Sequence, residues 1–435
     1  MLILISDLHF VDETAGEHNI PTRAFEGVFE DLKKYSGKPS EVKIVFLGDV
    51  FDINRTTYWL QPQVDESERP WGDMENKLEK IEMHANKIMD EILSKNRKTF
   101  DIFKGSLEDK FGVEPERIYI PGNHDRICNL FPSLRAKVRE NLGIPVDSEP
   151  FPHLYDDVDF GNKYGVLARH GHEYDVWNYE GSDNFNDSDY AQVPIGDLIT
   201  TEIAARLPYA VLKHVGTSLP PEQIVHLKRN LEEIENVRPY TAMFDWLFYQ
   251  VKENEDIKDI KENIEEALNE IVENFNNLQY LKKWYKRHDK FLTYDEADKL
   301  QAVISMFKFL GLESAEGLMK IYTKIFGTPD NLPMDNSDKT LIEKAKEFLT
   351  RKSEYRHCIM GHTHNPMQVP IRITNKGIDQ VYLNTGTWRA RHIKGLGGGF
   401  VTLKNLTYTI VYSKEEKEFQ QFETWTGSLK EVTLA

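Results

Sequence analysis

Cysteine is scarce in this chain, since only Cys128 and Cys358 occur among 435 residues. Two isolated cysteines exclude a disulfide framework and a C-x-x-C motif, which favours a reduced compartment. Long apolar runs are missing too, because no stretch reaches the roughly 18–20 residues of a membrane span. The first apolar run starts at Leu2 and leaves no room for a removable signal peptide. These absences predict a cytoplasmic protein without a membrane span.

Basic residues are also in short supply. The chain has 54 Lys plus Arg against 71 Asp plus Glu, which gives a formal net charge of −17. Nucleic acids and anionic membranes are bound through clusters of Lys and Arg, so a broad electrostatic footprint for either is disfavoured. A local basic groove for nucleic acid stays compatible with this balance. Composition says nothing about the oligomeric state.

The chain is rich instead in short clusters of Asp, Asn and His. There are five, in this order: Asp7-Leu8-His9, Gly48–Asp52, Gly122–Asp125, His170-Gly171-His172 and Gly361–His364. Four of them directly follow short apolar, mostly β-branched runs, which indicates that they lie at strand ends. Carboxylates, imidazoles and an amide form an N/O ligand mix that suits Mn²⁺, Fe and Zn²⁺. A carboxylate between two cations can bridge them, so the clusters predict a site for two divalent metal ions.

In these clusters the chain resembles the calcineurin-like metallophosphoesterases, whose signature is D-x-H, G-D-x-x-D, G-N-H-D/E, a later His at a strand end, and G-H-x-H. The resemblance covers residues 1 to about 175 and 356 to the C-terminus. It implies an α/β fold: a four-layer αββα sandwich with two central β-sheets flanked by helices. A large all-helical cap is expected as an insertion between the fourth and fifth clusters.

The resemblance also implies a role for each cluster residue. The first metal would have two carboxylate and two imidazole ligands: Asp7, His9, Asp49 and His364. The second would share the bridging carboxylate and add an amide and two imidazoles: Asp49, Asn123, His170 and His362. His124 would be the general acid, oriented by Asp52, because imidazole titrates near neutrality. Mn²⁺ is the expected ion, with Fe or Zn²⁺ as alternatives.

Three further residues are predicted to bind the substrate. His172 is expected to face the substrate, although it is also the alternative to His170 as the ligand from the fourth cluster. Arg55 lies in the loop after the second cluster and is expected to line a pocket for the non-phosphate part of the substrate. Arg389 follows a predicted strand, and its guanidinium offers a planar fork to two phosphate oxygens. The alternative for Arg389 is a surface ion pair. Trp59, close to Arg55, either lines the substrate pocket or packs the loop onto a helix.

The length of the chain suggests two or three structural units. The predicted catalytic core comprises residues 1–189, with a helical insertion at about 74–111, and residues 351–435. Residues 190–350 form the predicted cap, because apolar residues recur there at helical spacing. Helical runs are expected at 199–211, 264–278, 300–309, 318–325 and 341–349. Both ends of this segment adjoin ligand clusters, so it is expected to control access to the metals.

These features predict a metal-dependent phosphoesterase. It would hydrolyse a phosphomonoester, phosphodiester or pyrophosphate bond of a small or medium substrate, using a hydroxide bound to the dinuclear metal centre. One alternative is a metal-dependent nuclease whose cap guides the strand, which the acidic balance disfavours. A second alternative is a metal-holding scaffold without turnover, which the complete ligand set disfavours.

Overall fold

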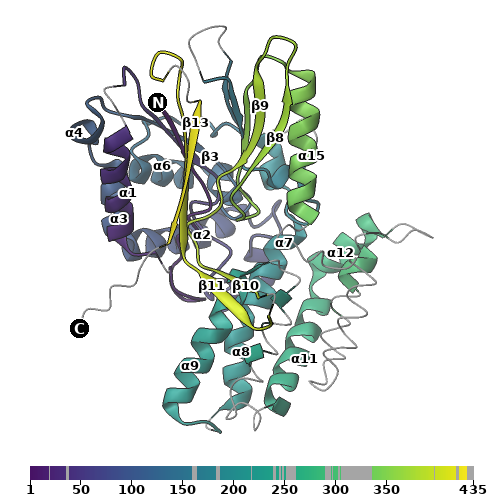
Figure 1. Ribbon diagram of the computed structural model, residues 1–435. Helices are drawn as coiled ribbons and strands as arrows, with labels where there is room; N and C mark the ends of the chain where they lie inside the picture. The colour runs from purple at the N-terminus through teal and green to yellow at the C-terminus, as the bar shows by residue number, and fades with distance from the viewer. Residues whose placement is uncertain are drawn as a thin grey trace.

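The structure is a computed structural model (Figure 1). It describes the chain except for residues 19, 36–38, 159–163, 183–186, 217, 239–241, 244–245, 247–248, 251–260, 290–294, 296, 302–303, 305–335, 396, 418–420 and 429–435. The helix expected at 318–325 therefore lies outside the described residues, as does nearly all of the one expected at 300–309.

The described strands form two five-stranded sheets, each of them mixed, and one smaller three-stranded sheet. The first has the order β13 (Phe422–Ser428), β12 (Asn405–Val411), β1 (Leu2–Ile5), β2 (Lys43–Leu47), β3 (Glu116–Ile120). The second has the order β4 (Tyr155–Asp157), β5 (Val166–Ala168), β7 (His357–Met360), β9 (Asp379–Asn384), β8 (Met367–Ile373). Parallel pairing joins β1 to β2 and β2 to β3 in the first sheet, and β5 to β7 and β7 to β9 in the second. The predicted clusters follow these parallel strands.

The two sheets pack against each other through alternate residues of their strands. Leu2 and Leu4 of β1 lie in one apolar cluster with Val166 of β5 and Ile359 of β7. Ile3 of β1 points the other way, into a cluster with helices. This alternation is the period of two that a strand imposes on its side chains. The inner faces of both sheets therefore form one shared core.

Helices cover the outer face of the first sheet. They are α1 (Thr22–Tyr35), α2 (Leu78–Lys95), α3 (Arg97–Lys104), α4 (Glu108–Phe111), α5 (Arg126–Leu130) and α6 (Pro132–Leu142). The helical spacing expected at 74–111 is observed in α2, where Ile81, Ala85 and Ile88 are buried in the apolar cluster that these helices share with the first sheet, although Leu78 is 40% exposed. Trp59 joins this cluster, and its indole Nε1 donates to the Ile53 carbonyl at 2.8 Å. These contacts agree with the packing interpretation of Trp59.

A second group of helices has an apolar cluster of its own and lies below the sheets in Figure 1. Its members are α7 (Ile195–Leu198), the π-helix η5 (Ile199–Ala205), α8 (Arg206–Val215), α9 (Pro221–Glu232), α11 (Lys261–Asn277) and α12 (Gln279–His288). The residues that recur at helical spacing fill this cluster, among them Leu207, Val211, Leu268 and Ile271. Helices therefore form where the sequence predicts them in the described part of 190–288.

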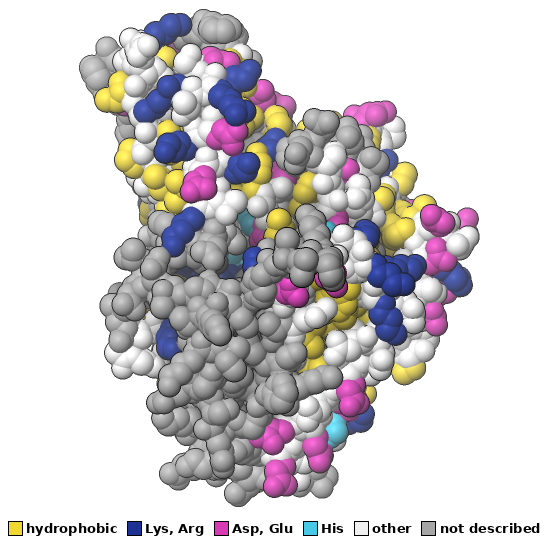
Figure 2. All heavy atoms as spheres, turned by 90° about the vertical axis from the view of Figure 1, so that its right-hand side faces the viewer, with side chains coloured by type: hydrophobic (Ala, Val, Ile, Leu, Met, Phe, Trp, Pro, Cys, Tyr) yellow, Lys and Arg dark blue, Asp and Glu magenta, His cyan; other side chains and the backbone are white. Residues whose placement is uncertain are grey.

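Two elements within 190–350 pack with the core. Helix α15 (Asn336–Arg351) covers the outer face of the second sheet, where Leu341 and Leu349 contact β7 and β9 residues. Strand β6 (Val237–Arg238) pairs in parallel with β10 (Arg391–Lys394), which pairs with β11 (Phe400–Leu403). The predicted cap range thus includes a helix and a strand that join elements of the core. Figure 2 shows the face that carries α15, where basic side chains stand among acidic ones.

Short 3₁₀ helices complete the described elements: η1 (Tyr58–Leu60), η2 (Glu66–Glu68), η3 (His172–Tyr174), η4 (Asp187–Ala191) and η6 (Glu233–Asn236). The fold is mixed α/β, which confirms the predicted class. In the described part of the chain, no helix pairs an apolar character with the length that a bilayer crossing requires.

Candidate metal centre

The clusters come together because they follow parallel strands of two sheets that pack face to face. The loops after β1 and β2 are joined by two backbone hydrogen bonds, from Asp7 N to the Gly48 carbonyl at 3.0 Å and from His9 N to the Asp49 carbonyl at 2.9 Å. In the second sheet, Gly361 N donates to the His170 carbonyl at 2.9 Å. The carboxyl ends of parallel strands meet at one edge, so this edge gathers side chains that are distant in sequence.

Left-handed backbone marks the same residues. Among the described residues, six other than glycine have positive φ, and five of these are predicted metal ligands: Asp7 (53°), His9 (50°), Asp49 (52°), His362 (69°) and His364 (61°). Each such residue costs about 1–3 kcal/mol and persists only where its surroundings fix it. Strain of this kind gathers at functional sites, so its concentration here supports a functional role for the cluster.

Two motif glycines let the backbone approach the ligands closely. A Cβ atom at Gly122 would meet the Asp49 carboxylate, and one at Gly48, whose φ is +84°, would meet the His170 ring. Alanine at either position would therefore displace a ligand. The glycines of the second and third clusters serve the packing of the site.

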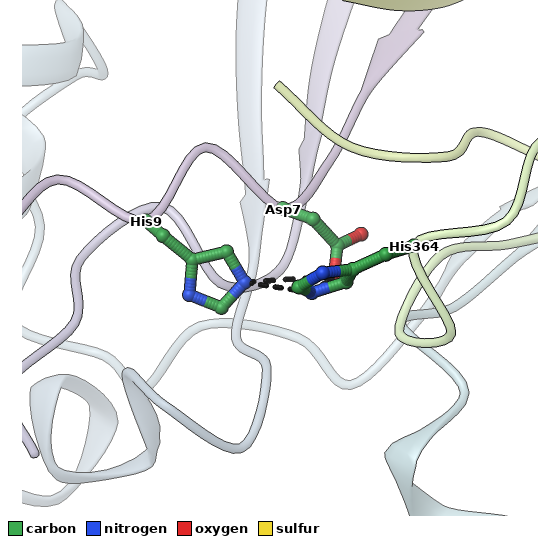
Figure 3. A group of neighbouring side chains, drawn as sticks. All are labelled: Asp7, His9 and His364. Carbon is green, nitrogen blue, oxygen red and sulfur yellow. Dashed lines mark hydrogen bonds and ion pairs between the residues drawn. The ribbon is translucent and has the colours of Figure 1, made fainter. Parts of the chain in front are cut away.

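Among the described residues, three groups of His and Asp have ligand atoms that all lie within 4.8 Å of one another, and Asp7, His9 and His364 form the first (Figure 3). His364 Nε2 lies 3.0 Å from His9 Nε2 and 3.2 Å from Asp7 Oδ1. Asp7 Oδ2 accepts from the His362 amide at 3.1 Å and from the Ser6 hydroxyl. Asp7 Oδ1 is buried and has no hydrogen-bond partner among the described residues. It is the oxygen that the site leaves for a cation.

Asp49 belongs to both other groups: His9, Asp49 and His124, and Asp49, His170 and His362. Its Oδ1 accepts from the His124 amide at 2.9 Å. Its Oδ2 lies 3.1 Å from His170 Nε2 and 3.8 Å from His9 Nε2. One carboxylate oxygen therefore stands between imidazoles that come from different sheets.

Hydrogen bonds to neighbouring groups determine which ring nitrogen of each candidate histidine ligand faces the site. His170 Nδ1 donates to the Leu47 carbonyl at 2.9 Å, and His9 Nδ1 donates to Asp52 Oδ2 at 3.1 Å, so Nε2 carries the lone pair whenever either ring is neutral. Such second partners are typical of metal-ligating histidines. The sequence reasoning predicted Asp52 only as the partner of His124.

His362 and Asn123 are arranged in the same way. His362 Nε2 donates to Asp175 Oδ2 at 3.0 Å, and Asn123 Nδ2 donates to Asn178 Oδ1 at 3.2 Å. The lone pairs of His362 Nδ1 and Asn123 Oδ1 then face each other at 3.1 Å. Two facing acceptors are a favourable place for a cation. Asp175 and Asn178 were missed by the sequence reasoning, because they belong to no motif.

We expect Asp175→Asn to weaken metal binding at the His362 group about 10- to 100-fold, the usual effect of losing such an outer partner. Titration calorimetry with Mn²⁺ measures this affinity. Asp379→Asn, at an exposed position at the start of β9, is the matched control and should bind as the wild type does. An unchanged affinity in Asp175→Asn would show that this carboxylate does not support a metal ligand.

Electrostatics fit a cation as well. Burial raises the pKa of Asp7 to about 6; the charge of His170 opposes this shift and that of Asp49 adds to it. Two carboxylates this deeply buried are costly unless positive charge compensates them. The buried His and Asp groups could therefore hold metal.

His364 differs from the other candidate histidine ligands in the position of its ring proton. The Arg238 guanidinium donates from Nη2 to His364 Nδ1 at 2.7 Å, so a neutral ring carries its proton at Nε2. To bind a cation through Nε2, a neutral His364 would have to carry its proton at Nδ1 and give up the hydrogen bond from Arg238. Arg238 lies on β6, outside every cluster, and the sequence reasoning missed it.

His124 and Asp52 form a buried pair beside these groups. His124 Nδ1 donates to Asp52 Oδ1 at 2.8 Å, and the His124 ring stands edge-on to His9 at 4.7 Å. Burial lowers the pKa of His124, but Asp52 and Asp49 outweigh it and raise the pKa to about 9. The distances alone would also allow His124 to be a ligand with His9 and Asp49, so the two roles need separate tests.

His172 lies beside the groups and belongs to none of them. Its ring centre is 5.4 Å from that of His170, and its Nδ1 is 3.7 Å from Glu173 Oε2. It also lines a small cavity with His153, Tyr190 and other residues. The structure thus brings His170, and not His172, to the candidate ligands.

Arg55 and Arg389 are buried, so neither forms the surface ion pair that was the alternative for Arg389. Both meet Glu235 of η6: Arg55 Nε lies 2.9 Å and Arg389 Nη2 3.1 Å from Glu235 Oε2. Arg389 Nη1 is also 3.8 Å from Asp52 Oδ2. The two arginines therefore lie together, next to the His124–Asp52 pair. No sequence signal singled out Glu235.

The chain matches no protein-family model, and no curated protein matches it either. Its likeness to a family thus rests on the residues of the five clusters and on the geometry that brings them together.

Proposed function

We propose that this protein is a metal-dependent phosphoesterase of the calcineurin-like type. The observation that carries the proposal is Asp49, whose carboxylate belongs to two groups of candidate ligands at once. Asp7, His9 and His364 would complete the shell of one cation. Asn123, His170 and His362 would complete that of the other. A shared carboxylate is the arrangement that places two metals close enough to act on one phosphoryl group.

The layers of the fold support the proposal. Helices, a first sheet, a second sheet and α15 pack in that order, an arrangement compatible with an αββα sandwich. The candidate ligands follow strands of both sheets. Fold alone does not determine function, so the proposal depends mainly on the residues of the site.

Within this proposal each candidate residue has a separate role in hydrolysis. Two bound divalent cations would supply an activated water and neutralise charge on the phosphoryl oxygens. His124, held through Nδ1 by Asp52, has Nε2 left to donate a proton to the leaving oxygen. His172 would border the part of the substrate that is not cleaved. Hydrolysis of a small or medium phosphomonoester, phosphodiester or pyrophosphate is the reaction that such a set supports.

The helices of residues 195–288 would control access. The candidate ligands Asp7, His9, Asp49 and His170 are at most 1% exposed, and His124 is 9% exposed. The helical segment contacts the core beside these residues. Asp197 forms an ion pair with Arg126 at 2.9 Å, and Thr201 Oγ1 donates to the Asn54 carbonyl at 2.8 Å. Substrate entry would therefore require this segment to move.

The deciding experiment is a panel of phosphomonoesters, phosphodiesters and oligonucleotides assayed with Mn²⁺. We expect hydrolysis of small esters that a chelator abolishes and Mn²⁺ restores. Preference for oligonucleotides would support the nuclease alternative instead. No turnover of any member by metal-loaded protein would support the scaffold alternative.

We also expect two metal ions per chain after loading with Mn²⁺, because the shared Asp49 completes two ligand sets. Elemental analysis of desalted protein measures this ratio. A folded, loaded protein that holds one ion or fewer would contradict the dinuclear arrangement.

A further inference from the structure

Three buried side chains from separate segments form an ion triad beside the candidate metal centre. Glu235 Oε2 lies 2.9 Å from Arg55 Nε and 3.1 Å from Arg389 Nη2. Arg55 Nη2 also donates to the Glu232 carbonyl at 3.0 Å. Arg55 is 2%, Glu235 6% and Arg389 4% exposed. Two guanidinium groups thus share one carboxylate oxygen away from solvent.

The buried guanidinium groups of Arg55 and Arg389 depend on the carboxylates beside them, Glu235 and Asp52, for charge compensation. Burial lowers the pKa of Arg55, and the charge of Arg389 lowers it further. Glu233, the other carboxylate of η6, pairs with His392 at 2.9 Å. Buried cations are costly unless anions compensate them, so the two guanidinium groups would need another anion if Glu235 moved away with the helical segment.

The triad adjoins the proposed catalytic residues. Asp52 Oδ1 accepts from the Arg55 amide at 3.1 Å and from His124, and Asp52 Oδ2 is 3.8 Å from Arg389 Nη1. A substrate whose phosphoryl group reaches His124 therefore passes close to Arg55 and Arg389. Glu235, by contrast, comes from the helical segment that would have to move.

We propose that Arg55 and Arg389 form a subsite for a second anionic group of the substrate, a phosphate or carboxylate that is not cleaved. Glu235 holds this subsite until the substrate anion replaces it between the two guanidinium groups. The inference rests on the proposed function and adds a substrate class: phosphoesters that carry a further anionic group. Guanidinium groups recognise both anions through paired N–H donors.

A triad with only a structural role and a triad that occupies an anion subsite predict opposite effects of removing Glu235 on anion binding. If Glu235 only positions the arginines, its removal should weaken anion binding. If it occupies the subsite, Glu235→Gln should strengthen anion binding, because the competing charge is gone. The sign of the change distinguishes the two.

The probe is inorganic phosphate, and binding is measured by calorimetry on the full chain. The measurement uses chains that also carry Asp49→Asn, shown by elemental analysis to be metal-free, so that phosphate held by metal does not contribute. Adding Glu235→Gln should tighten phosphate binding about tenfold or more, and adding Arg389→Gln as well should remove the gain. Glu233→Gln is the matched control, because that carboxylate faces His392. Equal or weaker binding in Glu235→Gln overturns the proposal.

Glu235→Gln removes the carboxylate that two buried guanidinium groups share, so the variant is expected to be less stable. Phosphate should then raise its thermal midpoint more than that of the chain with Glu235, because binding to the folded state stabilises it by mass action. A variant that phosphate does not stabilise overturns the subsite. These readouts need no turnover, so they stand apart from the test of hydrolysis.

The substrate class is tested on the metal-loaded, otherwise wild-type chain. We expect kcat/KM to be higher for an aryl phosphate with a ring carboxylate than for p-nitrophenyl phosphate, and Arg389→Gln to remove this preference. Equal values for the two esters in the wild type would overturn the assignment of the substrate class.

Discussion

Asp49→Asn is expected to empty the metal centre and to abolish hydrolysis. Asp49 Oδ2 lies within 3.8 Å of both His9 Nε2 and His170 Nε2, so the substitution affects both proposed cation positions. Asparagine keeps the size of the side chain and an oxygen that can accept from the His124 amide. It removes the negative charge, and its NH₂ group cannot act as a ligand.

The size of this effect follows from the burial of the site. Removing one partner of a buried charge pair costs about 3–5 kcal/mol, which corresponds to a metal affinity weaker by about two to three and a half orders of magnitude. Elemental analysis and Mn²⁺ calorimetry measure the loss, and circular dichroism tests the fold. Asp109→Asn, at a solvent-exposed aspartate, is the control. Full metal content in Asp49→Asn would remove the basis of the dinuclear proposal.

The ligand positions could be predicted from the sequence because their signal is local. Asp7, Asp49 and His170 each follow a strand at a fixed distance. Asp7 and Asp49 have left-handed backbone, which Asp, Asn and His tolerate best. The strand ends then meet because the strands are parallel and their two sheets share a core. Local pattern and global fold agree at these residues.

The outer partners could not be predicted, because they depend on tertiary packing alone. Asp175 and Asn178 reach the site through a loop without a motif, and Arg238 reaches it on a strand of two residues. The same limit applies to α15. Its spacing shows one buried face but not what covers that face, so the sequence assigned it to the cap, whereas it packs on the second sheet.

His124→Asn separates the chemistry from the metals. We expect kcat to fall by about 10²–10⁴, the usual contribution of general acid–base catalysis, while both metals remain bound. Asparagine cannot donate a proton as a general acid, but it preserves the backbone amide that donates to Asp49 Oδ1. The expected loss is therefore in kcat and not in metal affinity.

The comparison is kcat and Mn²⁺ content side by side in His124→Asn, in Asp52→Asn and in the surface control His226→Asn. Asp52→Asn should lower kcat too, because His124 then loses the carboxylate that orients it at 2.8 Å. Asp52 also holds His9 at 3.1 Å, so this variant should in addition bind metal more weakly. If His124→Asn itself empties a metal position, His124 is the ligand that its distance to His9 and Asp49 would allow, and the general acid must be another group.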